Sequence, residues 1–310
     1  MKERTLADYT KFFSYFIPGS RRRKQFRRNY RDNFSYLRLY WKYFFQYWRS
    51  KDKVELDFFE VWVGQRCTLK CKHCLHLMPY LKKHNLYDID ELIKDIKKIQ
   101  KIANIKHLSI AGGEPFTHPY LYKLLDFVYS NKDIQESEVV SNATIVPDTQ
   151  SLDLLKKLNG KLYIRVDVYP GNEKRGDEFL SVCRNYGIDC RVLFYPDKNN
   201  AKWYNAGTPD KKINSVQRTK EVYQACFIKH CNSMADGIFA PCCRGIITEQ
   251  IYGFPANKFE NLNIRKLKAN AFGKASLAVA TNQLYWKDFC RYCDGVSFLA
   301  EEVTPGIQLK

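Results

Sequence analysis

The chain has 310 residues, of which 45% are apolar and 15% aromatic, and its formal net charge is +18. This composition excludes general disorder, and the length allows one substantial core with an appendage or two small domains. No uncharged apolar run is long enough to span a bilayer, which argues against an integral membrane protein.

The sequence contains eleven cysteines, grouped as one triplet and several pairs. The first ten residues lack the apolar stretch of a secretory signal peptide. Disulfide frameworks belong to secreted proteins, whereas an odd and clustered set is typical of reduced thiols that bind metal. We therefore expect a cytoplasmic protein with metal–thiolate sites.

Residues 1–53 form a basic, aromatic extension with 15 Lys or Arg against 4 Asp or Glu, a net charge of +11. From residue 34 to 48, large apolar side chains recur at alternating steps of three and four, which predicts a helix with one aromatic stripe. The stripe consists of Phe34, Leu37, Trp41, Phe44 and Trp48. Such a helix can lie on an anionic membrane surface or pack on the rest of the chain or a partner, and both interpretations stay open. Nucleic-acid binding is disfavoured, because no recognition motif accompanies the basic residues.

From Leu56 onward, segments of strand and helix type alternate. Strands are expected over 58–63, 107–111, 138–141, 162–168 and 190–195. Helices are expected after Asp88, which caps the first, and over 120–129, 150–158 and 177–186. This alternation predicts a parallel sheet with right-handed crossovers, in which ligands bind beyond the carboxyl ends of the strands.

The first motif, Cys67-Thr-Leu-Lys-Cys71-Lys-His-Cys74, follows the first of these strands. Three thiolates with spacers of three and two residues can converge on one inorganic cluster from a single loop. Three ligands would leave one iron of a four-iron cluster open for a small molecule. Zinc is the alternative, with His73 or His76 as the fourth ligand.

The second motif, Ala111-Gly112-Gly113-Glu114-Pro115, follows the second strand. The glycines remove Cβ atoms that would keep a ligand from the backbone, and Glu114 supplies an anion for a nearby cation. By itself the motif is also an ordinary strand-to-helix turn. One βα unit after the cysteine triplet, however, it resembles the signature of the radical S-adenosylmethionine (radical SAM) superfamily.

This resemblance implies a fold, a cofactor and a mechanism. Residues 54–200 would form a partial (βα)6 barrel, and Cys67, Cys71 and Cys74 would hold a [4Fe-4S] cluster with S-adenosylmethionine on its open iron. The remaining contacts to the cofactor would come from His73, Gly112, Gly113, Glu114, Pro115, Ser141 and Asn142. The reduced cluster, supplied by flavodoxin or ferredoxin, would cleave S-adenosylmethionine to a 5′-deoxyadenosyl radical that abstracts hydrogen from the substrate.

Two charged residues lie on the fourth expected strand. Arg165 and Asp167 point to one face by the period of two, and both would be costly inside a barrel without a partner or ligand. They bind substrate or cofactor, or they pair with one another. Together with Tyr195 they are the candidates for the catalytic base.

The C-terminal part, residues 223–310, contains the remaining cysteine pattern, after a polar and mostly aperiodic segment over 201–222 that we expect to be a linker or a substrate-side loop. Its spacing resembles the twitch domain, a shorter relative of the SPASM domain that binds an auxiliary four-iron cluster. The resemblance implies four ligands: Cys226, Cys242, Cys290 and Cys293. Cys231 and Cys243 are surplus and either could replace a nominated ligand, and zinc bound by the same four cysteines is the alternative.

The sequence therefore predicts an α/β enzyme, a radical SAM oxidoreductase with a small iron–sulfur domain and a basic helical extension. The expected reaction is a net two-electron oxidation of a sugar, aminocyclitol or cell-envelope carbohydrate precursor, with the auxiliary cluster as electron acceptor. A maturase of a ribosomally made peptide is the alternative enzyme. A zinc-stabilised module that binds membrane or nucleic acid is the alternative from another class. We expect the protein in the cytoplasm, with residues 1–53 able to dock it on the membrane face.

Overall fold

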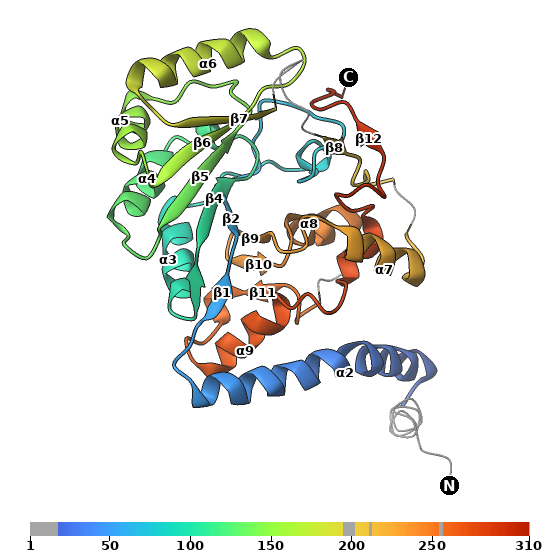
Figure 1. The fold of residues 1–310 in the computed structure, drawn as a ribbon. Coiled ribbons are helices and arrows are strands. Elements are labelled where there is room, and N and C mark those ends of the chain that lie inside the picture. Colours follow the sequence, from blue (N-terminus) through green and yellow to red (C-terminus); the bar gives the residue numbers. More distant parts are fainter. Residues whose placement is uncertain (1–17, 195–201, 211–212, 254–256, 310) are drawn as a thin grey trace.

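The computed structural model describes residues 18–194, 202–210, 213–253 and 257–309, with residues 21–34 described by their backbone alone. Figure 1 shows a sheet with helices packed along its outer side and a long helix, α2 (Ser20–Arg49), running along the base of the molecule. The expected α/β class is confirmed. Among the described residues, no helix combines the length and apolar composition needed to cross a membrane.

The frame is one eight-stranded sheet in the order β11-β10-β9-β2-β4-β5-β6-β7. Its parallel strands are β9 (Asn232–Ala235), β2 (Phe59–Trp62), β4 (His107–Ala111), β5 (Glu136–Ser141), β6 (Leu162–Asp167) and β7 (Cys190–Phe194). β10 (Ile238–Ala240) and β11 (Leu262–Asn263) continue it in antiparallel fashion. The strands β2, β4, β5, β6 and β7 follow one another in the expected chain order, and the sixth parallel strand, β9, joins beside β2. The C-terminal cysteine segment thus shares the sheet of the barrel.

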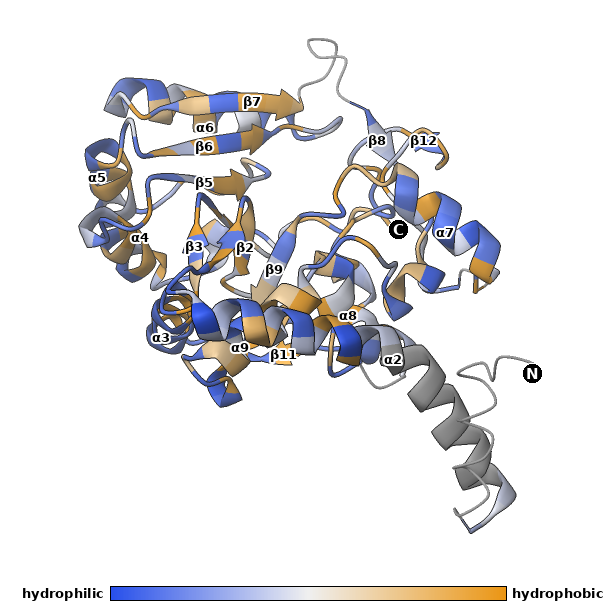
Figure 2. Cartoon of the chain, turned by 60° about the horizontal axis from the view of Figure 1, so that its bottom comes forward, coloured by the Kyte–Doolittle hydropathy of each residue, from blue (hydrophilic) through white to orange (hydrophobic). Residues whose placement is uncertain are grey.

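Four helices cover the outer face of this sheet: α3 (Ile89–Gln100), α4 (Leu121–Ser130), α5 (Thr149–Lys157) and α6 (Glu173–Tyr186). Each is hydrophobic on the side that faces the strands, and Figure 2 shows the mixed colouring that results. Asp88 caps α3 as expected, because its carboxylate accepts the N–H groups of Asp90 and Glu91. Helix α6 begins at Glu173 and not at residue 177.

The remaining elements belong to the loops and to the C-terminal segment. They are β1 (Val54–Leu56), β3 (Ala103–Ile105), β8 (Trp203–Tyr204), β12 (Glu302–Val303), α7 (Val216–Ala225), α8 (Cys243–Tyr252), α9 (Ala271–Ala280) and the short helices η1 (Met78–Tyr80), η2 (Pro115–Thr117), η3 (Ile264–Lys266) and η4 (Asp288–Tyr292). Helix α7 begins inside the expected linker over 201–222, which is a correction to that expectation. The reason is a cap: the Ser215 hydroxyl accepts the N–H of Arg218 at 3.1 Å.

Helix α2 packs on α9 with one face and exposes another. Its inward face includes Tyr36 and Leu39, which are 6% and 8% exposed and pack with Val279 of α9. The Tyr36 hydroxyl donates to the Glu260 carboxylate at 2.6 Å. The sequence stripe lies elsewhere: Leu37, Trp41 and Trp48 are exposed, Phe44 contacts Phe272, and the side chain of Phe34 lies outside the described residues. The two open interpretations of this helix therefore apply to two different faces.

The packed face of α2 generates a prediction. Replacing Leu39 by Ala should lower the free energy of unfolding by about 2 kcal/mol, because it leaves a cavity against α9. Trp48→Ala, on the exposed face, should change it by less than about 0.5 kcal/mol. Denaturant unfolding of the two variants measures the difference, and equal losses would mean that α2 does not pack as described.

Candidate functional site

The turn after β4 packs directly against the backbone that leads into the cysteine loop. The N–H of Gly113 donates to the carbonyl oxygen of Gly64 at 3.0 Å, and that of Glu114 to the carbonyl oxygen of Arg66 at 2.8 Å. A Cβ on Gly112 would lie 2.3 Å from the Gly64 oxygen, and one on Gly113 would lie 2.0 Å from the Arg66 oxygen. Both glycines are therefore needed for the packing of this turn against the segment before the cysteine loop.

Glu114 joins this turn to the end of β5. Its carboxylate is 1% exposed, and it accepts the N–H of Asn142 at 2.8 Å, the hydroxyl of Ser141 at 2.9 Å and the N–H of Phe116 at 3.2 Å. Burial raises the pKa of Glu114 to about 7, against the effect of these hydrogen bonds. The side chain thus holds two strand ends together. Its binding of an ammonium group stays a prediction, as do cofactor contacts from Pro115 and from the Ser141–Asn142 turn.

The three cysteines of the loop lie close to one another. Burial raises the pKa of Cys67 to about 12 and that of Cys74 to about 11, and it also raises the pKa of Cys71. A neighbouring thiol adds to each of these shifts: Cys74 for Cys67, Cys67 for Cys71 and Cys71 for Cys74. Ionising three thiols this close and this buried would require a cation between them, and this soft donor set fits an iron–sulfur cluster.

Two amide side chains donate hydrogen bonds to these sulfurs. Asn142 Nδ2 lies 3.6 Å from Cys67 Sγ, and Gln308 Nε2 lies 3.4 Å from Cys71 Sγ. The C-terminal tail pairs with the loop through backbone hydrogen bonds of 2.7 Å from Lys72 to Ile307 and 2.8 Å from Leu309 to Lys70. Sequence reasoning missed the tail, because nothing in its residue pattern points to the cysteine loop.

The two histidines of the loop differ in their surroundings. His73 accepts the indole N–H of Trp203 on its backbone carbonyl at 3.0 Å, and its buried Nδ1 atom has no hydrogen-bond partner among the described residues. That ring atom is therefore free to meet a ligand, although contact with the adenine stays a prediction. His76, which the zinc alternative would use, pairs with Glu60 at 3.3 Å.

The inner face of the sheet carries a polar row. The β-sheet register places Ser233, Glu60, Ser109, Glu138 and Tyr163 side by side across five strands. Burial alone would raise the pKa of Glu138, but His107, Arg165 and Ser109 outweigh it and lower this pKa to about 2. A carboxylate whose pKa is held well below its usual range therefore faces the barrel interior.

Arg165 and Asp167 lie in this interior and pair with each other, at 3.4 Å. Arg165 also lies 3.7 Å from Glu138. Burial raises the pKa of Asp167, and Arg165 opposes the shift. Asp167 Oδ1 and Arg165 Nε have no hydrogen-bond partner in the described part of the chain, so each keeps one atom for a ligand. Tyr195, the third candidate for the base, lies outside the described residues.

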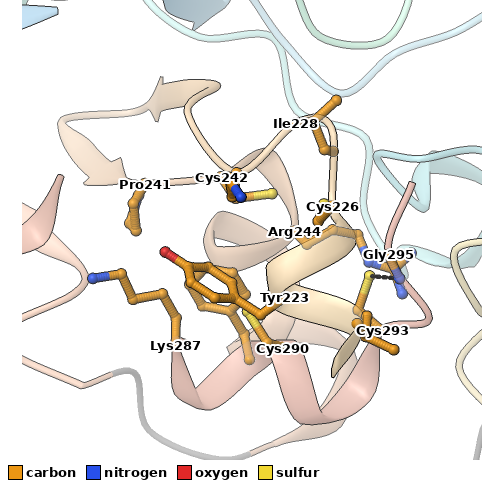
Figure 3. Close-up of a pocket in the computed structure, with 13 residues that line it drawn as sticks. Tyr223, Cys226, Ile228, Pro241, Cys242, Arg244, Lys287, Cys290, Cys293 and Gly295 are labelled. Carbon is orange, nitrogen blue, oxygen red and sulfur yellow. Dashed lines mark hydrogen bonds between the residues drawn. The ribbon is translucent and has the colours of Figure 1, made fainter. Parts of the chain in front are cut away.

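The four nominated auxiliary cysteines line one pocket (Figure 3). Cys226 follows α7, Cys242 precedes α8, and Cys290 and Cys293 belong to η4 and the residue after it. Burial raises the pKa of Cys226 to about 11 and that of Cys290 well above its usual value. The four cysteines that the resemblance to the twitch domain implies therefore lie around one pocket, and their role as cluster ligands stays a prediction.

A buried cation lies beside these thiols. Arg244 is 3% exposed and lines the same pocket, and its guanidinium donates to the carbonyl oxygens of Ala206, Gly207 and Tyr292 at 3.0–3.2 Å. None of these partners is a carboxylate, and a buried cation without a counter-ion is costly. The pocket thus fits an anionic metal–thiolate centre, whether a four-iron cluster or the zinc alternative. Sequence reasoning missed Arg244, because a single arginine after a cysteine pair carries no signal.

Comparison with known proteins supports one family. Residues 63–192 match the Radical SAM superfamily. GTP 3′,8-cyclase of Campylobacter lari is 29% identical over 110 residues, which cover 34% of each chain. GTP 3′,8-cyclase of Clostridium perfringens is 25% identical over 173 residues, 54% of this chain and 49% of the relative. The antilisterial bacteriocin subtilosin biosynthesis protein AlbA of Bacillus subtilis is 28% identical over 131 residues, 41% of this chain and 28% of the relative. The chain spans about half or less of the length of these relatives.

Among solved structures, BtrN in complex with AdoMet and 2-DOIA aligns with a TM-score of 0.46 at 14% identity, over 83% of this chain and 100% of that chain. The anSMEcpe structure with bound AdoMet and Cp18Cys peptide aligns with a TM-score of 0.46 at 13% identity, over 81% and 92%. The match over residues 63–192, the mostly parallel α/β sheet and the three-cysteine loop after its strand β2 lead to one conclusion: residues 63–192 form a radical SAM domain, and this family implies a four-iron cluster and S-adenosylmethionine.

Proposed function

We propose that this chain is a radical SAM enzyme that abstracts hydrogen from a substrate in the barrel interior and passes an electron from the substrate to an auxiliary four-iron cluster. The observation that carries the proposal is the presence of two separate thiol sets on one sheet. Three thiols lie in the loop after β2, and four line the pocket beside β9 and β10.

The chain's own residues would bind and orient the cofactor. When bound, a reduced four-iron cluster with S-adenosylmethionine supplies a 5′-deoxyadenosyl radical that can abstract hydrogen from an unactivated carbon. Cys67, Cys71 and Cys74 would hold the cluster, with Asn142 and Gln308 donating hydrogen bonds to two of the sulfurs. Such hydrogen bonds raise the reduction potential of a cluster. Flavodoxin or ferredoxin is the proposed reductant.

The barrel interior supports a polar substrate. Arg165 Nε and Asp167 Oδ1 are buried and unpaired among the described residues, and a ligand that accepts from the first and donates to the second would remove that cost. Either the cofactor or the substrate can supply these groups. Asp167, whose pKa burial raises, is the proposed residue to take up the proton that leaves with the electron.

The relatives favour a different substrate class from the sugar or aminocyclitol that we expected from the sequence. Neither GTP 3′,8-cyclase nor a bacteriocin biosynthesis protein supports the oxidation of a sugar or aminocyclitol. The match to AlbA favours the alternative, and we propose a ribosomally made peptide as the substrate. A zinc-stabilised binding module finds no support in the family match.

Iron analysis tests the first thiol set. Cys71→Ala should abolish the formation of 5′-deoxyadenosine from S-adenosylmethionine under reducing conditions, and it should lower iron from about eight to about four per chain. Cys183→Ala is a matched control, because Cys183 is 1% exposed and lies on α6, apart from both thiol sets. Full activity in the Cys71 variant would exclude the loop as the site of cleavage.

Substitution of a cysteine in the second thiol set should affect product formation but not the cleavage of S-adenosylmethionine. Cys290→Ala should also lose about four irons, but it should keep the cleavage of S-adenosylmethionine while product formation stops, because only the electron acceptor is removed. Product formed at the normal rate would remove the auxiliary cluster from the mechanism. Iron that stays near four in the unaltered protein, with zinc in the second pocket, would favour the zinc alternative.

The exposed face of α2 supports docking on an anionic membrane surface, which we propose as the location of the enzyme. Leu37, Trp41, Phe45 and Trp48 are between 38% and 64% exposed along one side of the helix. Arg38, Lys42 and Arg49 lie beside them at helical spacing, and residues 1–53 carry a net charge of +11. Aromatic rings at headgroup depth and cations that meet anionic lipids match this surface.

Substitutions on the exposed face test the docking without disturbing the packed face. The variant Trp41→Ala, Phe45→Ala, Trp48→Ala should pellet with anionic vesicles at least about tenfold less than the unaltered chain. Tyr129→Ala together with Phe298→Ala, two exposed rings on other elements, should bind as the unaltered chain does. If the triple variant pellets equally well, or if neutral vesicles bind as strongly as anionic ones, the proposal is wrong.

A further inference from the structure

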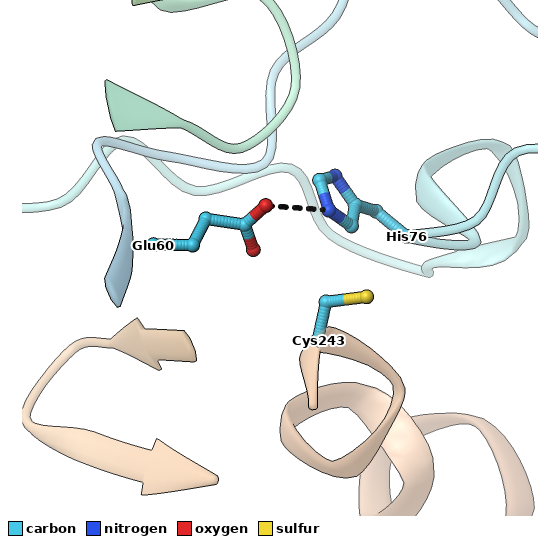
Figure 4. A group of neighbouring side chains, drawn as sticks. All are labelled: Glu60, His76 and Cys243. Atoms are coloured by element: carbon cyan, nitrogen blue, oxygen red, sulfur yellow. Dashed lines mark ion pairs between the residues drawn. The ribbon is translucent and has the colours of Figure 1, made fainter. Parts of the chain in front are cut away.

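Three side chains from distant segments of the chain meet in one place (Figure 4). Glu60 comes from β2, His76 follows Cys74 by two residues, and Cys243 begins α8 next to Cys242. One potential ligand atom from each lies within 4.8 Å of the other two. The side chains of Glu60 and His76 are 12% and 17% exposed, and Cys243 is 3% exposed.

The imidazole of His76 is held in one orientation. Its Nδ1 atom lies 2.9 Å from the carbonyl oxygen of Gly112, and because a carbonyl oxygen can only accept, Nδ1 must carry a proton. The other ring nitrogen, Nε2, points at Glu60 Oε2 at 3.3 Å. A histidine that donates its second N–H to a backbone carbonyl is the usual arrangement around a metal ligand, because the bond fixes the tautomer and the ring direction.

The carboxylate of Glu60 is held in the same way. Its Oε1 atom accepts the indole N–H of Trp62 at 2.6 Å and the hydroxyl of Ser233 at 2.9 Å. These bonds leave Oε2 to face His76 and Cys243. Each of the two polar groups therefore has one side fixed by the protein and one side directed to a common point.

The spacing of these atoms suits a tetrahedral ion. With zinc about 2.1 Å from both a nitrogen and an oxygen, a tetrahedral angle places the two ligand atoms about 3.4 Å apart. The observed separation of His76 Nε2 and Glu60 Oε2 is 3.3 Å. An ion pair between the two would also explain this distance, but it does not involve the Cys243 sulfur, which lies beside them and also contacts the Cys242 thiol.

We propose that Glu60, His76 and Cys243 bind one zinc ion, separate from both iron–sulfur sites. Mixed thiolate, imidazole and carboxylate donors are those that zinc accepts in tetrahedral sites. Three protein ligands leave the fourth position for water, as in zinc sites that keep an open position. The proposal does not depend on the reaction proposed above. It assigns a role to Cys243, which the auxiliary cluster leaves unused.

Metal analysis of the anaerobically purified full chain, supplied with both iron and zinc, tests the site. The unaltered protein should contain about one zinc in addition to its iron, and X-ray absorption at the zinc edge should show one sulfur near 2.3 Å with nitrogen and oxygen near 2.0–2.2 Å. Cys243→Ser and the isosteric Glu60→Gln should each lower bound zinc at least about tenfold while the iron content stays unchanged. The unchanged iron shows that these variants have folded.

Two control variants separate this site from the other thiols. Cys183→Ser should keep the zinc, and Cys67→Ala should lose iron but keep the zinc. Three outcomes would overturn the proposal. They are iron-replete protein with no bound zinc, a zinc edge with four sulfur neighbours, and a Cys243→Ser variant that loses iron in place of zinc.

Discussion

The close approach of two backbone segments, which only glycine allows, organises the site at the carboxyl ends of the strands. The turn at Gly112–Gly113 lies against the carbonyl oxygens of Gly64 and Arg66, directly before Cys67. The buried Glu114 of the same turn accepts hydrogen bonds from Ser141 and Asn142. The ends of β2, β4 and β5 are thereby fixed relative to one another. A cofactor held by the cysteine loop would meet a surface that the chain has already ordered, so little conformational entropy would be lost on binding.

The continuity of the sheet gives the second thiol set its position. Strand β9 pairs with β2, so the pocket of Cys226, Cys242, Cys290 and Cys293 is built on the same frame as the cysteine loop. The group formed by Glu60, His76 and Cys243 takes one residue from beside each set, because His76 follows Cys74 by two residues and Cys243 follows Cys242. Adjacent residues at the start of α8 thus have different neighbours: Cys242 lines the pocket, whereas Cys243 lies near Glu60 and His76. A single sheet that carries both thiol sets is suited to electron transfer, because it fixes the distance between them, whereas a flexible linker would let that distance vary.

Local patterns in the sequence predicted most of the frame. Period-two and period-3.6 apolar spacing located the strands β2, β4, β5, β6 and β7 and the helices α3 to α5, because these elements bury one face in a common core. The resemblance to the twitch domain pointed to four cysteines that line one pocket. The contacts that the sequence could not reveal are those between distant segments. Three such contacts depend on tertiary packing that leaves no periodic signal in the sequence. They are the hydrogen bond from Gln308 to Cys71, the position of Arg244 among the four thiols, and the pairing of β9 with β2. The split of α2 into a packed and an exposed face was likewise invisible, because aromatic residues occupy both.

The proposed reaction requires that one iron atom of the first cluster has no protein ligand. Electron paramagnetic resonance of the reduced, iron-replete Cys290→Ala variant, in which the first cluster is the one observed, tests this claim directly. The account predicts that S-adenosylmethionine changes the g-values of the signal and that selenium or isotope-labelled methionyl groups couple to it. A spectrum that is identical with and without the nucleotide would mean that the fourth iron is already occupied, and it would contradict the account.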